Sequence, residues 1–364
     1  MRDKIVTLEK SIKDVDAETL KKTFGNLKGS ELMRSIIMNE KQYCTCTHPR
    51  SQRNFWYSVV KPCLDKLGKL SPQDDTEDAL TGWDKKLSKY LSEMVSEGKL
   101  TYQDIMIFDE SRNYNVPVYS FSPYSNIIVA CEKDTIYSIV EDISRLLGCS
   151  CISSKGLCSL GAMEQLIRKI QLSKDEPLTE IILLILSDYD PTGYNIADTL
   201  AEHAKTILRV LGSECVVKSK RIGIVPEQLT EDEIKNNMYT PKRKGIEKWM
   251  ELTGGIDGQE KGLELDALDQ DRTREIFASA LQPYIDSSEY FEYGKSTYLI
   301  SKIREEIEKY TDGIVKQVYT EMQDKVNASD FNMLDYVRLG LTSMPVNEIY
   351  SVSGVEDCVR KYFE

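Results

Sequence analysis

The pattern of hydrophobic positions in the middle of the chain alternates between short apolar runs and helical spacings. The runs cover residues 126–131, 150–152 and 181–186, and apolar residues at intervals of three or four follow them over 136–147, 160–170 and 196–211. Short unbroken runs bounded by turn residues are typical of strands buried on both faces. Strands that alternate with helices predict an α/β fold with a Rossmann-like parallel sheet.

Acidic residues stand directly after two of these runs. Glu132 follows the first strand, and Asp188 and Asp190 follow the third. Because parallel strands end at the same edge of a sheet, we expect the three carboxylates to converge there. Carboxylates at such short distances repel one another unless a cation lies between them. The arrangement therefore predicts a site for Mg²⁺, with Mn²⁺ as an alternative. The competing interpretation is that Asp188 to Pro191 simply form a turn.

The flanking segments have different patterns. Residues 1–45 carry apolar faces at helical spacing and predict an N-terminal helical segment. Residues 46–122 predict helix, loop, helix and a final wing or short helix, an order that suits a winged-helix-like module. The α/β region, residues 123–300, contains a polar, glycine-rich insertion at 226–262, and residues 301–364 predict a C-terminal helical segment.

Two further features leave more than one interpretation open. Glu264 and Asp266 alternate with apolar residues, so both could point to one side of a strand, either near the metal or into solvent. An apolar row spaced by three and four runs through a charged helix and contains Ile300, Ile303, Ile307, Tyr310 and Ile314. Such a row packs on the core or on a second subunit.

The net charge bears on the kind of partner. The chain has 364 residues and a formal charge of −12. A nucleic-acid-binding protein usually shows a basic face, so this charge counts against DNA binding unless basic residues gather locally, as they do at 218–221 and 242–244. No apolar run is long enough for a membrane span, and the N-terminus lacks the apolar core of a signal peptide. We therefore expect a cytoplasmic protein without a membrane partner.

The cysteines agree with that compartment. Nine are scattered without a disulfide framework, which fits reducing cytosol. Cys44, Cys46 and His48 lie close together, but no second Cys/His pair accompanies them. Their spacing therefore does not predict a zinc site.

Three stretches, in this order, resemble one family. Residues 129–134, VACEKD, are similar to the VVEKD of the topoisomerase VI A subunit and the related meiotic double-strand-break transesterase. Residues 154–156, SKG, match the last two positions of the family's GKG turn, and residues 187–196, SDYDPTGYNI, resemble its DxDPxGxxI. A Glu after the first strand and Asp-x-Asp after a later one is the pattern of the Toprim domain, so the resemblance implies that fold for about residues 120–225.

An upstream stretch extends the resemblance. Residues 53–58, RNFWYS, are similar to the family's stretch in which the second of two aromatic residues is the nucleophilic tyrosine, and the aligned residue is Tyr57. The resemblance implies catalytic roles for Tyr57, for Arg53 as a nearby positive charge, and for Glu132 beside the metal. A phenol is a poor nucleophile without such help. The alternative is that Tyr57 is a packing residue in a chain with 20 tyrosines.

The resemblance implies Mg²⁺-dependent cleavage of double-stranded DNA by tyrosine transesterification. In the family, tyrosine and metal site come from different subunits, which implies a homodimer, and strand passage would need a separate ATPase subunit. The candidate DNA-binding residues are Lys155, Lys218, Lys220 and Arg221. Two rivals remain: a Toprim nuclease of phage or plasmid defence that hydrolyses DNA without Tyr57, and a non-catalytic Toprim-like interaction protein, which the acidic charge favours.

Overall fold

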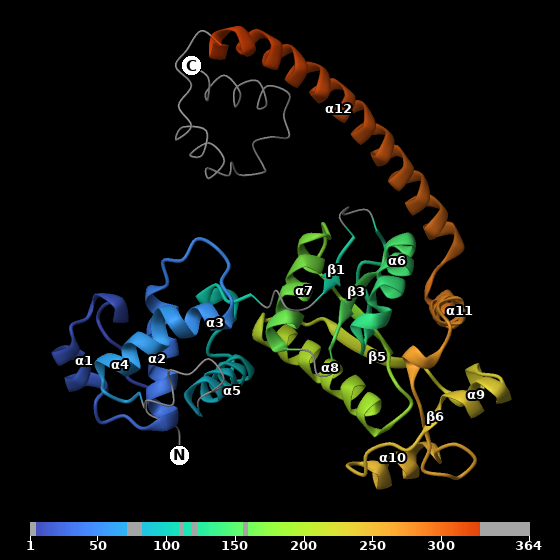
Figure 1. Cartoon of the computed structure of the whole chain (residues 1–364), viewed down its shortest axis with the longest axis horizontal. Coiled ribbons are helices and arrows are strands. Elements are labelled where there is room, and N and C mark those ends of the chain that lie inside the picture. The colour runs from blue at the N-terminus through green and yellow to red at the C-terminus, as the bar shows by residue number, and fades with distance from the viewer. Residues whose placement is uncertain (1–4, 71–81, 109–112, 118–121, 156–158, 328–364) are drawn as a thin grey trace. The chain divides into compact units, whose positions relative to one another are not determined.

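A mostly parallel sheet with the strand order β1-β3-β2-β4-β5 organises the α/β region (Figure 1). The parallel strands are β3 (Ser150–Ser153), β2 (Ile127–Cys131), β4 (Glu180–Leu186) and β5 (Val216–Gly223), and the short β1 (Tyr114–Asn115) pairs antiparallel with β3. The computed structural model describes residues 5–70, 82–108, 113–117, 122–155 and 159–327. The predicted mixed α/β class and mostly parallel sheet are confirmed.

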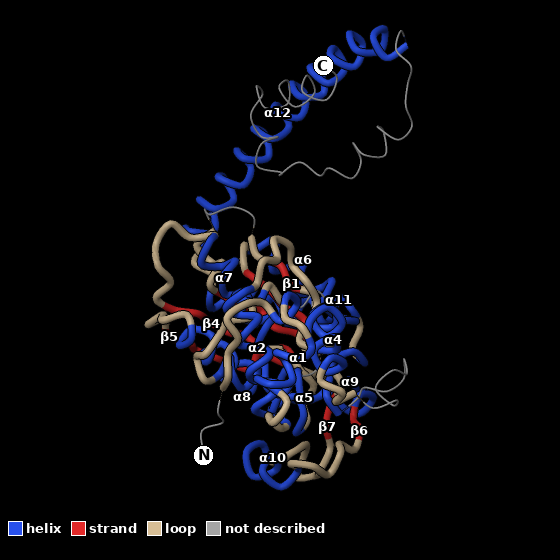
Figure 2. The backbone as a smooth tube through the Cα atoms, turned by 90° about the vertical axis from the view of Figure 1, so that its left-hand side faces the viewer, coloured by secondary structure: helices blue, strands red, loops and turns tan. Residues whose placement is uncertain are grey.

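Helices cover both faces of this sheet, which explains the unbroken apolar runs. Ile128 and Ala130 of β2 belong to an apolar cluster with residues of α7 (Leu160–Leu172) and α8 (Pro191–Val210). The alternate residues Val129 and Cys131 belong to a second cluster with residues of α6 (Tyr137–Leu147) and α11 (Gln270–Leu281). Figure 2 shows the helices around the strands of the sheet. A strand buried on both faces has no polar side, so its sequence is apolar throughout.

The N-terminal part is helical, as its apolar spacing predicted. Its elements are α1 (Ala17–Phe24), α2 (Gly29–Tyr43), α3 (Gln52–Phe55), a π-helical segment η2 (Trp56–Val60), α4 (Lys61–Lys66) and α5 (Gly82–Ser96). After α5 the described residues form the 3₁₀ turn η4 (Gln103–Ile105), and β1 pairs with the main sheet. The described residues therefore show no wing hairpin, and residues 71–81 and 109–112 of the expected module lie outside them.

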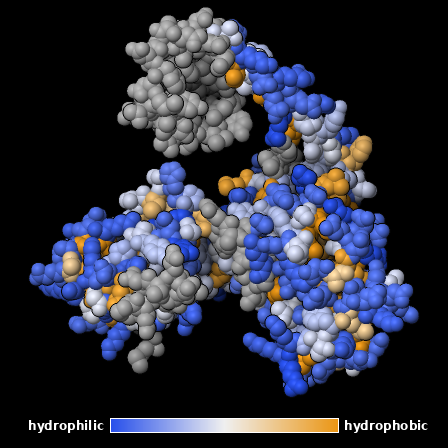
Figure 3. Space-filling model, in the orientation of Figure 1, coloured by the Kyte–Doolittle hydropathy of each residue, from blue (hydrophilic) through white to orange (hydrophobic). Residues whose placement is uncertain are grey.

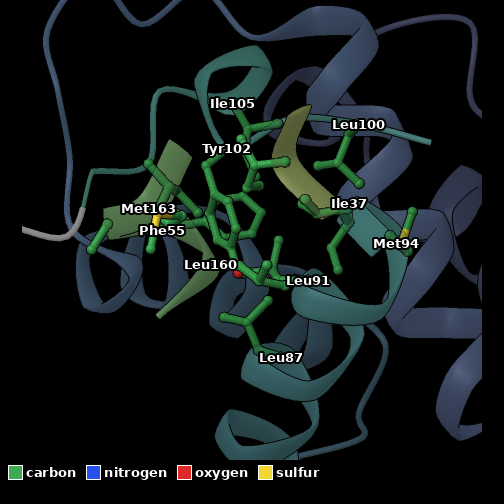
Figure 4. Close-up of a cluster of buried hydrophobic side chains, with 14 of the residues drawn as sticks. Ile37, Phe55, Leu87, Leu91, Met94, Leu100, Tyr102, Ile105, Leu160 and Met163 are labelled. Carbon is green, nitrogen blue, oxygen red and sulfur yellow. The ribbon is translucent and has the colours of Figure 1, made fainter. Parts of the chain in front are cut away.

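One apolar core joins the N-terminal helices to the α/β region. Tyr102, just after α5, lies in the cluster that contains Phe55 from the N-terminal part and Leu160 and Met163 from α7 (Figure 4). The backbone N–H of Tyr102 also donates to Oε2 of Glu164 on α7, at 2.8 Å. Residues 1–290 accordingly form one compact unit.

The insertion after β5 has more structure than its polar sequence suggested. It contains α9 (Glu231–Asn237), β6 (Met238–Tyr239) and α10 (Ile246–Thr253), and β6 pairs antiparallel with β7 (Gly262–Leu263). The prediction of a strand through Glu264 and Asp266 is wrong. Strand β7 ends at Leu263, and residues Leu265–Ala267 form the 3₁₀ turn η7. The turn begins there because the Leu265 N–H donates to the Asp188 side chain rather than to a neighbouring strand.

The second unit begins at Phe291. Its described part belongs to α12 (Ser287–Asn327), so the boundary expected at residue 300 falls inside a continuous helix. The visible surface of this helix is mostly hydrophilic (Figure 3), although Ile303, Ile307 and Tyr310 are exposed along it. Residues 328–364 of the expected C-terminal segment lie outside the described residues. No described helix combines the length and apolar character that crossing a bilayer requires.

Candidate metal centre at the carboxyl edge of the sheet

Glu132 and Asp188 meet at the carboxyl edge of β2 and β4. The two strands are adjacent and parallel, and Cys131 lies opposite Leu186 in the register. The Glu132 N–H donates to the Leu186 carbonyl at 2.9 Å, and the Asp188 N–H donates to Oε2 of Glu132 at 3.1 Å. The strand register therefore brings together two acids that are 56 positions apart in the sequence.

Asp190 lies beside this pair but is held by other groups. It is the N-cap of α8, and its Oδ1 accepts from the Gly193 N–H at 2.6 Å. Its Oδ2 accepts from the hydroxyl of Tyr239 at 2.7 Å. Asp190 thus has the turn role that its place before Pro191 allowed. Among the described residues, the three acids are not a group whose ligand atoms all lie within 4.8 Å of one another.

Gly193 makes this turn sterically feasible. A Cβ atom at this position would lie 2.2 Å from the Asp188 carbonyl oxygen and 3.0 Å from Oγ of Ser187. Neither the backbone oxygen nor the short serine side chain can move far enough to remove such a clash. Glycine is therefore required for α8 to start so close to the end of β4.

Lys133 forms an ion pair with the Asp188 carboxylate. Its Nζ lies 3.0 Å from Oδ2 of Asp188 and 2.5 Å from Oδ1 of Asp266. The second oxygen of Asp188, Oδ1, accepts from the Leu265 N–H at 2.8 Å. Burial alone would lower the pKa of the Lys133 ammonium, but its hydrogen bonds and attraction to the two aspartates raise it overall.

The crowded carboxylates of the edge favour a bound cation, and Lys133 already supplies one positive charge there. Burial, together with the charges of Asp188 and Asp190, raises the pKa of Glu132 to about 7. Burial also raises the pKa of Asp188, although the Leu265 N–H and Lys133 act in the opposite direction. Crowded carboxylates with raised pKa values gain most from a divalent cation, and their hard oxygen donors suit Mg²⁺ or Mn²⁺. The chemistry of Glu132 and Asp188 therefore fits such an ion.

Arg221 faces this edge from inside the protein. Its Nε donates to Oγ of Ser187 at 3.0 Å, and its Nη2 donates to the carbonyls of Ser187 and Asp188, each at 2.6 Å. The guanidinium also lies 4.6 Å from the ring centroid of Tyr194. Burial lowers its pKa. These contacts give Arg221 a role in holding the backbone after β4.

The other candidate DNA-binding residues are more accessible. Lys155 forms an ion pair with Asp134 at 2.9 Å, and Lys218 on the edge strand β5 pairs with Glu180 at 2.5 Å. Lys220 is exposed on the same strand. The structure thus leaves the three lysines near the surface, whereas Arg221 is partly buried.

Tyr57 lies in the N-terminal helical part with two cations near its ring. Its side chain is 49% exposed. The guanidinium carbon of Arg53 lies 5.8 Å from the ring centroid, and Nζ of Lys61 lies 5.7 Å from it. Tyr57 belongs to the π-helical segment η2, a deviation that often marks functional positions in helices. Such exposure does not suit a purely packing role.

Arg53 also lines a cavity of about 420 Å³ between the N-terminal helices and α7. Its walls are formed by Ser51, Gln52, Arg53, Ser88, Ser92, Tyr102, Ile107, Phe108, Ser159 and Gly161. Four serine side chains and one guanidinium border this opening, but most of its lining surface is apolar. Arg53 lies one helical turn before Tyr57 in the sequence.

The cysteine pair noted in the sequence lies next to a glutamate. Among the described residues, Glu40, Cys44 and Cys46 have ligand atoms within 4.8 Å of one another. However, Glu40 is ion-paired with the buried Arg50 at 2.6 Å, and the same guanidinium nitrogen lies 3.8 Å from Sγ of Cys44. A positive charge already present in this group opposes binding of a metal cation.

Sequence reasoning missed three features of the acidic edge. Lys133 stands in the motif beside Glu132, but nothing local indicates that it bridges Asp188 and Asp266. Tyr239 reaches Asp190 from the insertion, 49 positions away, with no signal in the sequence. Asp266, expected on a strand, reaches the site from a turn and through Lys133 instead.

Comparison with known proteins adds no relative. No protein-family model matches the chain, and no curated protein matches it. The fold and the site therefore define the class: a mixed α/β protein that gathers acidic residues at the carboxyl edge of a mostly parallel sheet.

Proposed function

We propose that the protein cleaves double-stranded DNA by tyrosine transesterification in a reaction that depends on Mg²⁺. The observation that carries the proposal is the meeting of Glu132 and Asp188, where a backbone N–H of one residue donates to the carboxylate of the other. Ligands of α/β sheets bind outside the carboxyl ends of the strands, which is where these acids lie. The resemblance of three ordered motifs to the Toprim pattern supports the same assignment.

Glu132 and Asp188 would hold the cation, with Asp190 as their acidic neighbour. When bound there, Mg²⁺ supplies Lewis-acid stabilisation of negative charge on the phosphate and on the leaving oxygen. Arg221 contributes by fixing the carbonyl groups that precede the metal-binding side chains. Lys155, Lys218 and Lys220 are the candidates for contacts with DNA phosphates, which supply most of the affinity in such complexes.

Tyr57 would provide the nucleophile. Its phenol would lose a proton as its oxygen forms a bond to phosphorus, and the bond from phosphorus to the 3′-oxygen would break. The 3′-oxygen would take up a proton to leave as a hydroxyl, and the protein would become joined to the 5′-phosphate. Arg53 and Lys61, which both lie within 6 Å of the ring, supply positive charge to the phosphate during this exchange. A homodimer would place two such tyrosines on one duplex, and a separate ATPase subunit would be needed for strand passage.

Hydrolysis is the second candidate, and one observation favours it. With no cation bound, burial and the charges of Asp188 and Asp190 raise the pKa of Glu132 to about 7. If Asp188 holds the cation and Glu132 is not a ligand, Glu132 can act as a general base on water at neutral pH. In that reaction Tyr57 would take no part, and the DNA ends would be free of protein. The two candidates use the same acidic edge and differ in the nucleophile.

The test is incubation with supercoiled plasmid and Mg²⁺ or Mn²⁺, followed by electrophoresis with and without prior protease treatment. Transesterification predicts 5′ ends that carry protein, loss of cleavage in Tyr57→Phe and in Asp188→Asn, and full activity in the matched control Tyr298→Phe, another exposed tyrosine. Free ends together with an active Tyr57→Phe variant would establish hydrolysis instead. If the wild-type protein leaves plasmid intact with either ion, also after addition of an ATPase partner, the enzymatic proposal fails.

A further inference from the structure

The oxygen atoms of Asp188 have different partners, and this limits where a cation can bind. Oδ1 accepts the Leu265 N–H at 2.8 Å, a contact within the protein that also starts the turn η7. Oδ2 has Nζ of Lys133 at 3.0 Å. A divalent cation that coordinates this less constrained oxygen of Asp188 therefore competes with the lysine ammonium for it.

Asp266 offers the ammonium a second position. Its Oδ1 lies 2.5 Å from Nζ of Lys133, so the lysine already contacts both carboxylates. The side chains of Lys133 and Asp266 are 24% and 32% exposed, whereas that of Asp188 is 9% exposed. The lysine and its outer partner thus border solvent, and Asp188 does not. The ammonium can leave Asp188 and remain paired.

We propose that Lys133 is a built-in competitor for the divalent cation at Asp188, and that Asp266 receives its ammonium when the cation binds. This inference rests on the metal site proposed above. With no cation, Lys133 neutralises an aspartate whose burial would otherwise be costly. With a cation bound, the ammonium and the ion repel each other at short range, so withdrawal toward Asp266 lowers the free energy of the complex.

The proposal predicts how Mn²⁺ affinity responds to charge at two positions. Lys133→Met removes the competitor and keeps most of the side-chain stem, so Mn²⁺ should bind about tenfold more tightly. Asp266→Asn removes the withdrawal position, so Mn²⁺ should bind severalfold more weakly. In the Lys133→Met background, Asp266→Asn should have little effect, because no ammonium remains to be received.

Isothermal titration calorimetry with MnCl₂ on the full chain measures these affinities, and electron paramagnetic resonance of free Mn²⁺ checks them. Lys205→Met is the matched control, since it removes one exposed lysine from the far end of α8 and should leave the affinity unchanged. Asp188→Asn should abolish the tight site in every background. Lys133→Gln, which keeps a hydrogen-bond donor without the charge, serves as the second variant if Lys133→Met does not fold.

Each outcome decides between the claims. Equal Mn²⁺ affinity in wild type and both Lys133 variants would overturn the competition and leave the metal site standing. If Asp266→Asn weakens Mn²⁺ binding equally in the presence and absence of Lys133, Asp266 is a direct ligand of the cation. Its role as the position that receives the Lys133 ammonium would then be overturned. Binding in the Lys133 variants alone would support strong competition. Absence of binding in wild type and in both Lys133 variants would remove the proposed metal site together with this inference.

Discussion

Replacing Glu132 with glutamine should stabilise the folded protein at pH 8 when divalent cations are absent. The pKa of the Glu132 carboxyl is raised from 4.5 to about 7, chiefly by burial and then by the charges of Asp188 and Asp190. At 1.36 kcal/mol for each pH unit, this rise corresponds to about 3 kcal/mol. Partial access of water to the side chain reduces the expected gain to about 2 kcal/mol. Glutamine removes the charge and can still accept from the Asp188 N–H.

The pH dependence of this gain follows from proton binding. Between pH 4.5 and about 7 the folded protein holds a proton on Glu132 that the unfolded chain has lost. The stability of the wild type therefore falls as pH rises through this window, relative to Glu132→Gln. The difference should be near zero at pH 4.5 and complete at pH 8.

Differential scanning calorimetry in EDTA, from pH 5 to 8, measures the effect. A gain of about 2 kcal/mol corresponds to a melting temperature about 4 °C higher for the variant at pH 8. Glu251→Gln, at an exposed position on α10, is the control and should show no such pH-dependent difference. Mg²⁺ should then stabilise the wild type and leave the variant nearly unchanged. A Glu132→Gln variant that is less stable than wild type at pH 8, or whose advantage does not change with pH, refutes the reasoning.

Three further predictions concern other parts of the chain. Arg221→Ala should lower the free energy of unfolding by about 2 kcal/mol in urea titrations, because the Asp188 carbonyl loses its guanidinium donor and the Ser187 carbonyl keeps only the Ile224 N–H. Substitution of its exposed neighbour, Lys220→Ala, should cost less than about 0.5 kcal/mol. Gly193→Ala should lower the free energy of unfolding by at least 2 kcal/mol, roughly, and weaken Mn²⁺ binding, because its Cβ would lie 2.2 Å from a backbone oxygen. The control Thr192→Ala should change neither the stability nor the Mn²⁺ affinity. If α12 mediates the proposed dimer, Ile307→Asp should shift sedimentation toward the monomer, and an unchanged profile would exclude this row from the interface.

The sequence alone determined the elements around the site. Apolar runs buried on both faces predicted strands β2, β3 and β4, and helical spacing predicted α6, α7 and α8, because these patterns depend on local side-chain periodicity. The parallel order of the strands then placed Glu132 and Asp188 at one edge. Residues that follow neighbouring parallel strands lie at the same edge of the sheet, whatever the length of the chain between the strands. The juxtaposition of Glu132 and Asp188 therefore follows from the strand pattern alone.

Only the tertiary structure decided which partners these acids have. Lys133 bridges to Asp266 across 133 positions, and Tyr239 reaches Asp190 from an insertion whose sequence indicated only a polar loop. Arg221 follows the exposed Lys220 on an edge strand, yet its guanidinium donates to the Ser187 and Asp188 carbonyls after β4. Such contacts depend on how the insertion and the edge strand fold back onto the sheet. The local periodicity of the sequence carries no information about that folding. These contacts form because polar groups that become buried in the tertiary structure need hydrogen-bond partners.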